Sequence, residues 1–419
     1  MSPQILTAPV QAPKKAPVSS FVPERTAKSV SETISALLPE LMALRHELHE
    51  HPEIRFEERW TSDRISRYLT EAGVPHTRGH ALGTGIVATI EGALPGPTIA
   101  LRADMDALEI HEETGLPYAS QIPQRMHACG HDGHSTMLCG AAKVLQQHRH
   151  TLRGRVKCIF QPAEEQAAGG RYIVSEGLLD DVNAVFAMHC WPDLAVGTAT
   201  AGDGRVMASA DYFCIDVNGK GGHGADPAST IDPIVVAAHI VTALQGIVSR
   251  EVNPWDSAVV SVACINAGQA SNVIPGTARI EGTYRALCPK VRARVQEGIE
   301  RVASGVATAF RATATTYTGE DGYPVLDNDP GMAKFAREVI ATALGPNAEI
   351  PLTHPYMTAE DFAYYLQKVP GAFIFLGNRA AHVAPGEAPT LHTATFNFND
   401  DALPHGVALL TTLATRFLS

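Results

Sequence analysis

Apolar residues in the first part of the chain recur three or four positions apart, which is helical spacing. They predict an amphipathic helix that stops before Pro52 and whose apolar stripe is formed by Leu37, Leu38, Leu41, Leu44 and Leu48. A second helix is expected at about 58–72, ending at Gly73. Ordered structure is therefore expected to begin near Ser31, after a flexible tail (residues 1–30) rich in Pro, Ala, Ser and Lys.

Short apolar runs then alternate with helical patterns. The runs predict strands at 85–91, 98–102, 156–161 and 182–189, and the helical patterns lie at about 133–148, 329–344, 360–369 and 401–418. Strands that alternate with helices predict an α/β domain with a mixed, mostly parallel sheet flanked by helices. Polar residues gather where these strands end, so we expect the functional site along the carboxyl edge of the sheet.

The pattern changes in the middle of the chain. Three runs of alternating apolar and polar residues predict strands at 211–217, 258–266 and 277–285, and two helices are expected at 232–250 and 289–308. The order β-α-β-β-α, with antiparallel neighbours, predicts an inserted ferredoxin-like α+β domain. We expect it to span 204–312 and to divide the catalytic domain into residues 31–203 and 313–419.

Composition narrows the class of protein. The formal net charge is -11 and no basic run occurs, which argues against a nucleic-acid partner. No apolar stretch approaches the length of a membrane span and the tail lacks the apolar segment of a signal peptide, so no membrane partner is expected. The 7 cysteines are scattered, and most lie in apolar runs, which predicts free thiols and a cytoplasmic location.

Two short segments carry the residues of a metal site. Cys129 and His131 lie two positions apart in a glycine-punctuated loop just before a predicted helix, where both side chains can reach one ion. The alternative is a polar loop in which Asp132 or Ser135 caps the helix. About thirty residues later, a predicted strand leads into Glu164 and Glu165, whose side chains should point to opposite sides, one toward metal and the other toward water.

Three histidines extend this set. His189 ends a second apolar run and is a further candidate ligand, although a hydrogen-bonded core histidine would give the same pattern. His392, in Leu-His-Thr-Ala-Thr-Phe, is weaker as a single residue. His223 lies among glycines in the inserted domain, which indicates close backbone approach to a ligand or to a neighbouring chain.

These segments occur in an order that resembles a known family. The matching segments are Arg-His-Glu-Leu-His at 45–49, His-Pro-Glu at 51–53, Leu-Arg-Ala-Asp-Met-Asp-Ala-Leu at 101–108, His-Ala-Cys-Gly-His-Asp-Gly-His at 127–134, Pro-Ala-Glu-Glu at 162–165, Met-His at 188–189, Gly-Lys-Gly-Gly-His at 219–223, Ser-Asn-Val-Ile-Pro at 271–275, Glu-Gly-Thr-Tyr-Arg at 281–285 and Glu-Asp-Phe at 360–362. From about residue 35 onward the chain resembles the amidohydrolase branch of the dimetal aminoacylase/carboxypeptidase superfamily. That branch contains hippurate hydrolases, N-acyl-amino-acid amidohydrolases and auxin-conjugate hydrolases.

The resemblance implies a role for each residue of the site. Two divalent metal ions would be held by Cys129, His131, Glu165, His189 and His392, with Cys129 between the ions. Glu164 would be the general base, and Asp106 would orient a metal-binding residue. Thiolate and imidazole ligands favour zinc, while the carboxylate also suits manganese.

The resemblance also implies a role for the inserted domain. It would act as a lid and pair subunits in a homodimer or a higher homo-oligomer, so that His223 reaches a neighbouring active site and helps bind the oxyanion. Asn272 and Arg285 would hold a substrate carboxylate, although Arg285 would serve equally as a structural ion-pair partner.

The chain departs from the family pattern near the substrate. His392 is followed by Thr-Ala-Thr-Phe where the family has Asn-Pro and an aromatic residue, and Glu109 stands where it has Pro. We therefore predict a metal-dependent amidohydrolase that cleaves N-acyl or N-aroyl amino acids or a related small amide. A dipeptidase or carboxypeptidase on the same scaffold is the nearest alternative, and a metal-bearing binding protein without turnover is the other.

Overall fold

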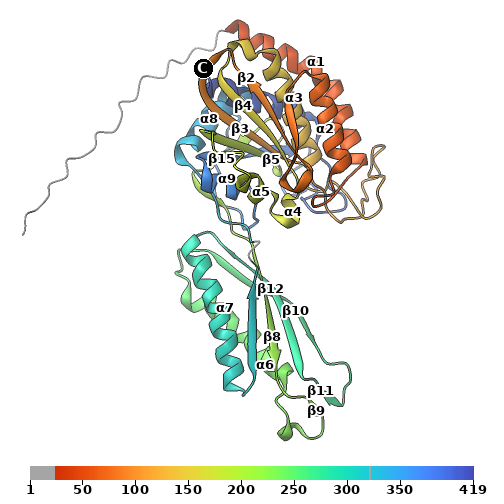
Figure 1. Cartoon of the computed structure of the whole chain (residues 1–419), viewed down its shortest axis with the longest axis vertical. Helices are drawn as coiled ribbons and strands as arrows, with labels where there is room; N and C mark the ends of the chain where they lie inside the picture. Colours follow the sequence, from red (N-terminus) through yellow and green to blue (C-terminus); the bar gives the residue numbers. More distant parts are fainter. Residues whose placement is uncertain (1–23, 320–321) are drawn as a thin grey trace, which may run out of the picture.

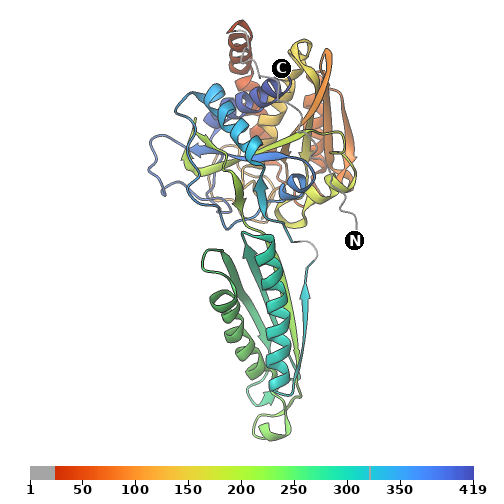
Figure 2. The ribbon, with the colours of Figure 1, turned by 90° about the vertical axis from the view of Figure 1, so that its left-hand side faces the viewer.

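The computed structural model describes residues 24–319 and 322–419, which form two bodies joined by two crossings of the chain (Figures 1 and 2). The larger body contains both ends of the described chain, and the smaller extends away from it. Of the predicted tail, residues 1–23 lie outside the described residues. Residues 24–30 belong to helix α1 (Glu24–Glu50), so regular structure begins earlier than Ser31.

The larger body is built on a mixed sheet. Within the described residues the strand order is β1-β2-β4-β3-β5-β15-β6. The bounds are β1 (His76–His80), β2 (Gly85–Glu91), β3 (Leu94–Asp104), β4 (Arg153–Gln161), β5 (Ala184–Ala195), β6 (Ala199–Thr200) and β15 (Gly371–Arg379). Parallel pairing is confined to β4, β3, β5 and β15, and the strands at both edges pair antiparallel. The predicted mixed α/β sheet is confirmed. Strand β15 was not among the predicted strands, although Ala-Phe-Ile-Phe-Leu at 372–376 is a continuous apolar run.

Helices cover both faces of this sheet. Successive side chains of a strand point to opposite faces, so Leu101 joins one buried cluster while its neighbour Ala100 joins the other. The first cluster is covered by α1, α2 (Arg59–Glu71), α3 (His131–Gln147), α8 (Pro330–Leu344) and α10 (Leu403–Phe417). The second is covered by α5 (Gly169–Ser175) and α9 (Ala363–Lys368). The sheet is thus buried on both faces, and its strand ends remain for the site.

The smaller body, which we call the inserted domain, has its own sheet and core. Its elements are β8 (Asp211–Asn218), α6 (Pro233–Gly246), β10 (Ala258–Ala267), β12 (Thr277–Ala286), α7 (Pro289–Ala309) and β13 (Thr313–Thr318). The described strands pair antiparallel in the order β10-β12-β8-β13, which is the ferredoxin-like arrangement. Strand β13 was not predicted from the sequence and lies beyond the range 204–312 expected for this domain.

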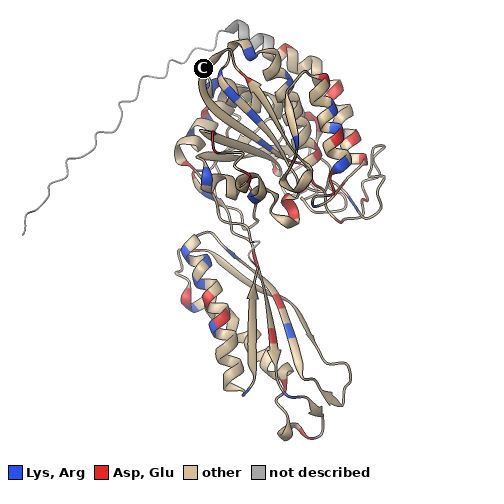
Figure 3. Ribbon diagram, in the orientation of Figure 1, with Lys and Arg blue, Asp and Glu red and all other residues tan. Residues whose placement is uncertain are grey.

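One helix of the inserted domain is unusually apolar. Residues Pro233–Glu251, which comprise α6 and a following π-helical turn, are long and apolar enough by composition to cross a membrane. The prediction that no stretch reaches this length is therefore wrong. The helix nevertheless packs one side against the sheet of its own domain, where Val236, Ile240 and Leu244 are buried. Figure 3 shows acidic and basic residues interspersed over both bodies.

Candidate metal centre

The five predicted ligands lie together beside the carboxyl ends of the central strands. Cys129 lies two residues before the start of α3, and His131 is the first residue of that helix. His189 lies in β5, and Glu165 lies in the short helix α4 (Glu164–Ala167), which follows β4. His392 comes from the loop after β15, and its backbone N–H donates to the Ala128 carbonyl over 2.8 Å.

The ligand atoms of these side chains converge. The Cys129 Sγ atom lies 3.3 Å from Nε2 of His189 and 3.3 Å from Nε2 of His392. The Glu165 Oε1 atom lies 3.3 Å from Nε2 of His392 and 3.8 Å from Nε2 of His131. Cys129 thus stands next to two histidines, while Glu165 contacts the third histidine as well as His392. Thiolate, imidazole and carboxylate within this distance of one another form the donor set of a divalent metal site.

The hydrogen bonding of these atoms also fits a metal. Among the described residues, His131 Nε2 and Glu165 Oε1 are buried and make no hydrogen bond, although Glu165 Oε1 is within ion-pair distance of His392 Nε2. A buried polar atom without a partner costs free energy, so such atoms are expected to face a ligand. Because the two unpartnered atoms face each other across 3.8 Å, a cation between them would satisfy both.

Neighbouring groups orient the candidate ligands. Asp106 Oδ1 lies 3.1 Å from His131 Nδ1, and Asp106 Oδ2 accepts from the backbone N–H of Glu165 over 3.0 Å. His189 Nδ1 lies 2.8 Å from the carbonyl oxygen of Cys190. Hydrogen bonds of this kind leave Nε2 of each imidazole directed at the cluster. Asp106 therefore contacts two of the candidate ligands, the His131 side chain and the Glu165 backbone.

The alternative interpretation of the segment around His131, a polar loop in which Asp132 or Ser135 caps the helix, does not agree with the structure. Gly130 precedes the helix in a left-handed conformation (φ 85°), and no side chain caps it. Asp132 is buried and instead pairs with His49 Nδ1 over 2.8 Å and Arg45 Nη1 over 3.1 Å. Ser135 donates to the backbone carbonyl of Asp104 over 2.7 Å. Two residues of the Arg-His-Glu-Leu-His segment on α1 thereby fix the first turn of α3.

The glutamate pair differs from its predicted form. Both residues follow strand β4 as predicted, but they lie in the short helix α4, between Ala163 and Ala168 in left-handed conformations (φ 57° and 50°), and not in an extended segment. Their carboxylates still diverge, because Glu164 Oε1 accepts from the backbone N–H of Asp361 over 3.3 Å while Glu165 faces the histidines. Burial raises the pKa of the Glu164 carboxyl well above its ordinary value, and the carboxylates of Glu360 and Glu165 raise it further.

A buried charge network behind the glutamates was not predicted. Arg102, fully buried in β3, pairs with Asp104 at 2.7 Å, Asp361 at 2.9 Å and Glu360 at 3.1 Å. Asp361 also accepts from the backbone N–H of Gly170 over 2.7 Å. The network therefore joins β3, the segment after α4 and the Glu360–Asp361 segment. The sequence signal was a pair of charged residues, Arg102 and Asp104, at the end of an otherwise apolar strand.

The predicted catalytic residue His223 and the predicted substrate-binding residues Asn272 and Arg285 lie in the inserted domain. His223 is in β9 (Gly222–His223), which pairs with β11 (Val273–Ile274) at the end of the domain far from the larger body (Figure 1). Asn272 is adjacent, and its carbonyl accepts from Gly224 N–H over 2.8 Å. Arg285 lies in β12 with its guanidinium 6.0 Å from the Tyr212 ring, and among the described residues its Nη1 has no partner. His223 and Asn272 are therefore distant from the metal ligands of their own chain, whereas Arg285 lies near the opposite end of β12, next to Ala286, whose carbonyl accepts from the Ser209 N–H over 2.8 Å.

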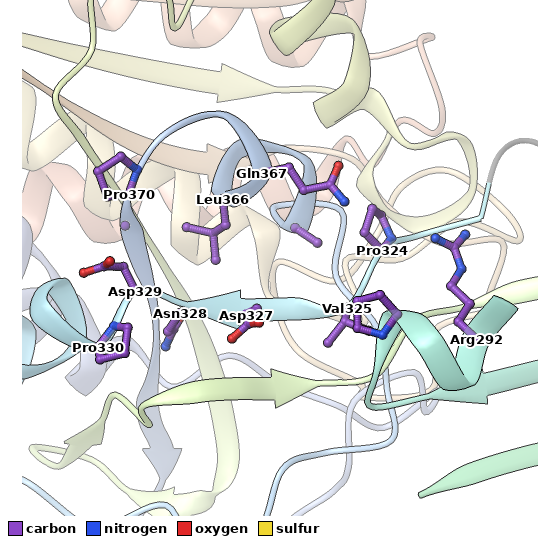
Figure 4. A pocket seen from close by; sticks show the side chains of 13 residues that line it. Arg292, Pro324, Val325, Asp327, Asn328, Asp329, Pro330, Leu366, Gln367 and Pro370 are labelled. Carbon is purple, nitrogen blue, oxygen red and sulfur yellow. The ribbon is translucent and has the colours of Figure 1, made fainter. Parts of the chain in front are cut away.

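A separate cavity of about 430 Å³ lies where the two bodies meet (Figure 4). Its lining includes Arg292 of α7, Val325 and Asp327 of the second crossing, and Gln367 of α9. None of the five candidate ligands lines it. The cavity therefore marks the junction of the two bodies and not the metal centre.

Comparison with known proteins identifies the family. Residues 100–416 match the model for peptidase family M20/M25/M40. The chain is 42% identical over 349 residues to an N-acetyl-L-cysteine deacetylase of Bacillus subtilis, covering 83% of each protein. It is 39% identical over 381 residues to an IAA-amino acid hydrolase of Arabidopsis thaliana, covering 90% of this chain and 86% of that protein.

A solved structure agrees with this result. A dinuclear metal binding peptidase from the M20 family, from Bacillus subtilis, superposes with a TM-score of 0.79 at 38% identity, covering 92% of this chain and 99% of that one. The predicted enzyme class, a metal-dependent amidohydrolase, is confirmed by these matches. The chain belongs to peptidase family M20/M25/M40.

Proposed function

We propose that this enzyme hydrolyses the amide bond of N-acyl or N-aroyl amino acids, or of a related small amide, with Glu164 as general base. The observation that carries the proposal is the convergence of Cys129, His131, Glu165, His189 and His392, with a second buried glutamate directly beside them. An amidohydrolase needs both, because water must be activated and a proton must be moved to the leaving amine.

Each residue of the site would have a separate role in this reaction. The five ligands would hold two divalent ions, which when bound lower the pKa of water and polarise the amide carbonyl. Glu164 would accept the proton of the attacking water and then donate it to the departing amine nitrogen. Its raised pKa suits a group that must both take and release a proton near neutral pH. Asp106 would keep the His131 imidazole in its ligating orientation.

The substrate class is tested by amino-acid release. Purified protein loaded with Zn²⁺ or Mn²⁺ is expected to release amino acid from N-benzoylglycine and from N-acetyl amino acids, and chelator-treated protein is not. Restored release after metal is added back excludes unfolding as the cause. Release from dipeptides alone would favour the peptidase alternative. Bound metal without release from any amide would favour the binding-protein alternative.

We also propose that the inserted domain joins two chains. Strand β10 is at an edge of its sheet in the described structure and exposes Val259 and Ile265. Helix α6, packed beside it, exposes Ile234 and Val235. An open strand edge beside apolar residues favours pairing with an identical strand around a twofold axis. Such a dimer would allow His223, distant from the metal ligands of its own chain, to serve the partner's active site. Asn272, next to His223, and Arg285 would then bind the substrate carboxylate.

Replacing His223 by alanine tests this arrangement. We expect turnover to fall about 10²- to 10³-fold, as for loss of an oxyanion donor, while metal content is unchanged. Loss of metal would place His223 among the ligands instead.

A mixed dimer shows whether His223 acts on the active site of its own chain or on that of the neighbouring chain. His223→Ala and Glu164→Gln chains carrying different tags are co-expressed, and the heterodimer is purified. One of its two sites then has both residues intact only if His223 acts on the neighbouring chain. Recovery of about half the wild-type activity is expected, whereas an inactive heterodimer would show that both residues act within one chain. Migration as a monomer would contradict the dimer itself.

We propose zinc as the metal and a reducing compartment as the location of the protein. Cys129 and the three histidines favour zinc on grounds of ligand softness, and Glu165 leaves manganese as the second choice. All seven cysteines lie in the described part of the chain and are free, which supports a reducing compartment such as the cytoplasm.

A further inference from the structure

The chain passes twice between the two bodies. These two connecting segments, which we call the crossings, are hydrogen-bonded to each other next to Glu164 and Glu165. Ala210 immediately precedes β8 on the outgoing crossing, and Tyr323 lies on the returning one. Tyr323 N–H donates to the Ala210 carbonyl over 2.7 Å, and Ala210 N–H donates to the Tyr323 carbonyl over 3.0 Å. We call this reciprocal pair, Ala210 and Tyr323, the hinge pair. Any rotation of the inserted domain must act on it.

The hinge pair is also tied to both bodies. Asp211, next in the chain, is buried and accepts from Arg292 of α7 over 2.8 Å and 2.6 Å. Tyr364 of α9 in the larger body donates to the Gly322 carbonyl over 2.8 Å. A Cβ atom added to Gly322 would lie 2.0 Å from Asp211 Oδ1, so only glycine permits this close approach of the two crossings. The position of Tyr323 is therefore determined by contacts from both sides.

The side chain of Tyr323 connects this hinge to the proposed base. Its hydroxyl donates to the backbone carbonyl of Glu164. Two further backbone anchors of this turn come from the larger body: Ala163 N–H donates to Glu58 over 2.9 Å, and Glu165 N–H donates to Asp106 over 3.0 Å. Tyr323 is thus the anchor that reaches the Glu164 turn from the hinge.

We propose that Tyr323 is a positioning residue that sets the geometry of Glu164 from the hinge of the inserted domain. The inference rests on the proposed role of Glu164 as general base. A helix of four residues between two left-handed positions has little stability of its own, so its side chains are directed by what holds its backbone. A displacement of the base by about 1 Å is enough to lower a rate on the order of 10²-fold. Movement of the inserted domain would consequently change the placement of Glu164 through this hydroxyl.

Tyr323→Phe tests the inference, because it removes the hydroxyl and keeps the ring. We expect kcat on an N-acyl amino acid to fall on the order of 10- to 10²-fold. KM, metal content and melting temperature are expected to stay near the wild-type values. Tyr317→Phe, the same change at an exposed tyrosine of β13, is the matched control and is expected to keep wild-type kcat. Should Tyr323→Phe fail to fold, Gly322→Ala displaces the same crossing and must lower kcat instead.

A double variant shows whether Tyr323 acts through Glu164. In Glu164→Asp, whose shortened side chain already misplaces the carboxylate, adding Tyr323→Phe should lower kcat by less than about twofold, because coupled residues are not additive. A full additional loss would overturn the inference, and so would wild-type kcat in Tyr323→Phe alone. Equal turnover by wild type and Glu164→Gln would instead contradict the proposed function, so the two failures are distinguishable.

Discussion

Replacement of Cys129 by alanine is expected to abolish metal binding and turnover together. The Sγ atom is the group that approaches both His189 and His392, each at 3.3 Å, and it lies in the same small space as Glu165. An alanine methyl group offers no lone pair, so the histidines would face each other without the anion that offsets the charge of the cations. Turnover should fall on the order of 10³-fold, because activation of water and polarisation of the carbonyl are lost at once.

The measurement is metal content per chain by atomic emission, alongside amino-acid release. Cys139→Ala is the matched control: this thiol is also buried, but it lies inside helix α3, where it packs within the apolar cluster. The control should retain metal and activity. A Cys129→Ala protein that keeps both its metal and its turnover would contradict the role of Cys129 between the ions.

Replacement of Glu164 by glutamine should separate turnover from metal binding. Glutamine has nearly the same shape and can still accept from the backbone N–H of Asp361, so the fold of the turn should persist. It cannot take a proton from water, and loss of a general base typically costs about 10²- to 10⁴-fold in rate. The ligands are unchanged, so metal content should equal that of the wild type.

Single-turnover rates and metal content are measured on the same preparations. Glu91→Gln, at an exposed position of β2, controls for the change of charge. A Glu164→Gln enzyme with wild-type rates would remove Glu164 from the mechanism. One that loses metal would instead make Glu164 a ligand, and Glu165 would then be the candidate base.

Much of the fold was predictable because it is encoded locally. Helical spacing of leucines located α1, and continuous apolar runs located β2, β4 and β5, since a strand buried on both faces must be apolar throughout. Strand β13 was missed for the opposite reason: Thr313–Thr318 is rich in threonine and half exposed, so it has no apolar signal. The turn at Glu164 was misjudged because the left-handed conformation of Ala163 has no sequence signature.

The sequence by itself determined which residue types are available for the site and that they follow strand ends or open a helix. Only the tertiary structure decided that Cys129 and His392, 263 positions apart, share one small space. It also decided that Arg102 gathers three carboxylates, that Tyr323 reaches Glu164 from the hinge, and that His223 lies far from the ligands of its own chain. The physical reason is that periodicity reports how each segment buries its own side chains, whereas these contacts arise from sheet order and from the path of the chain between two bodies.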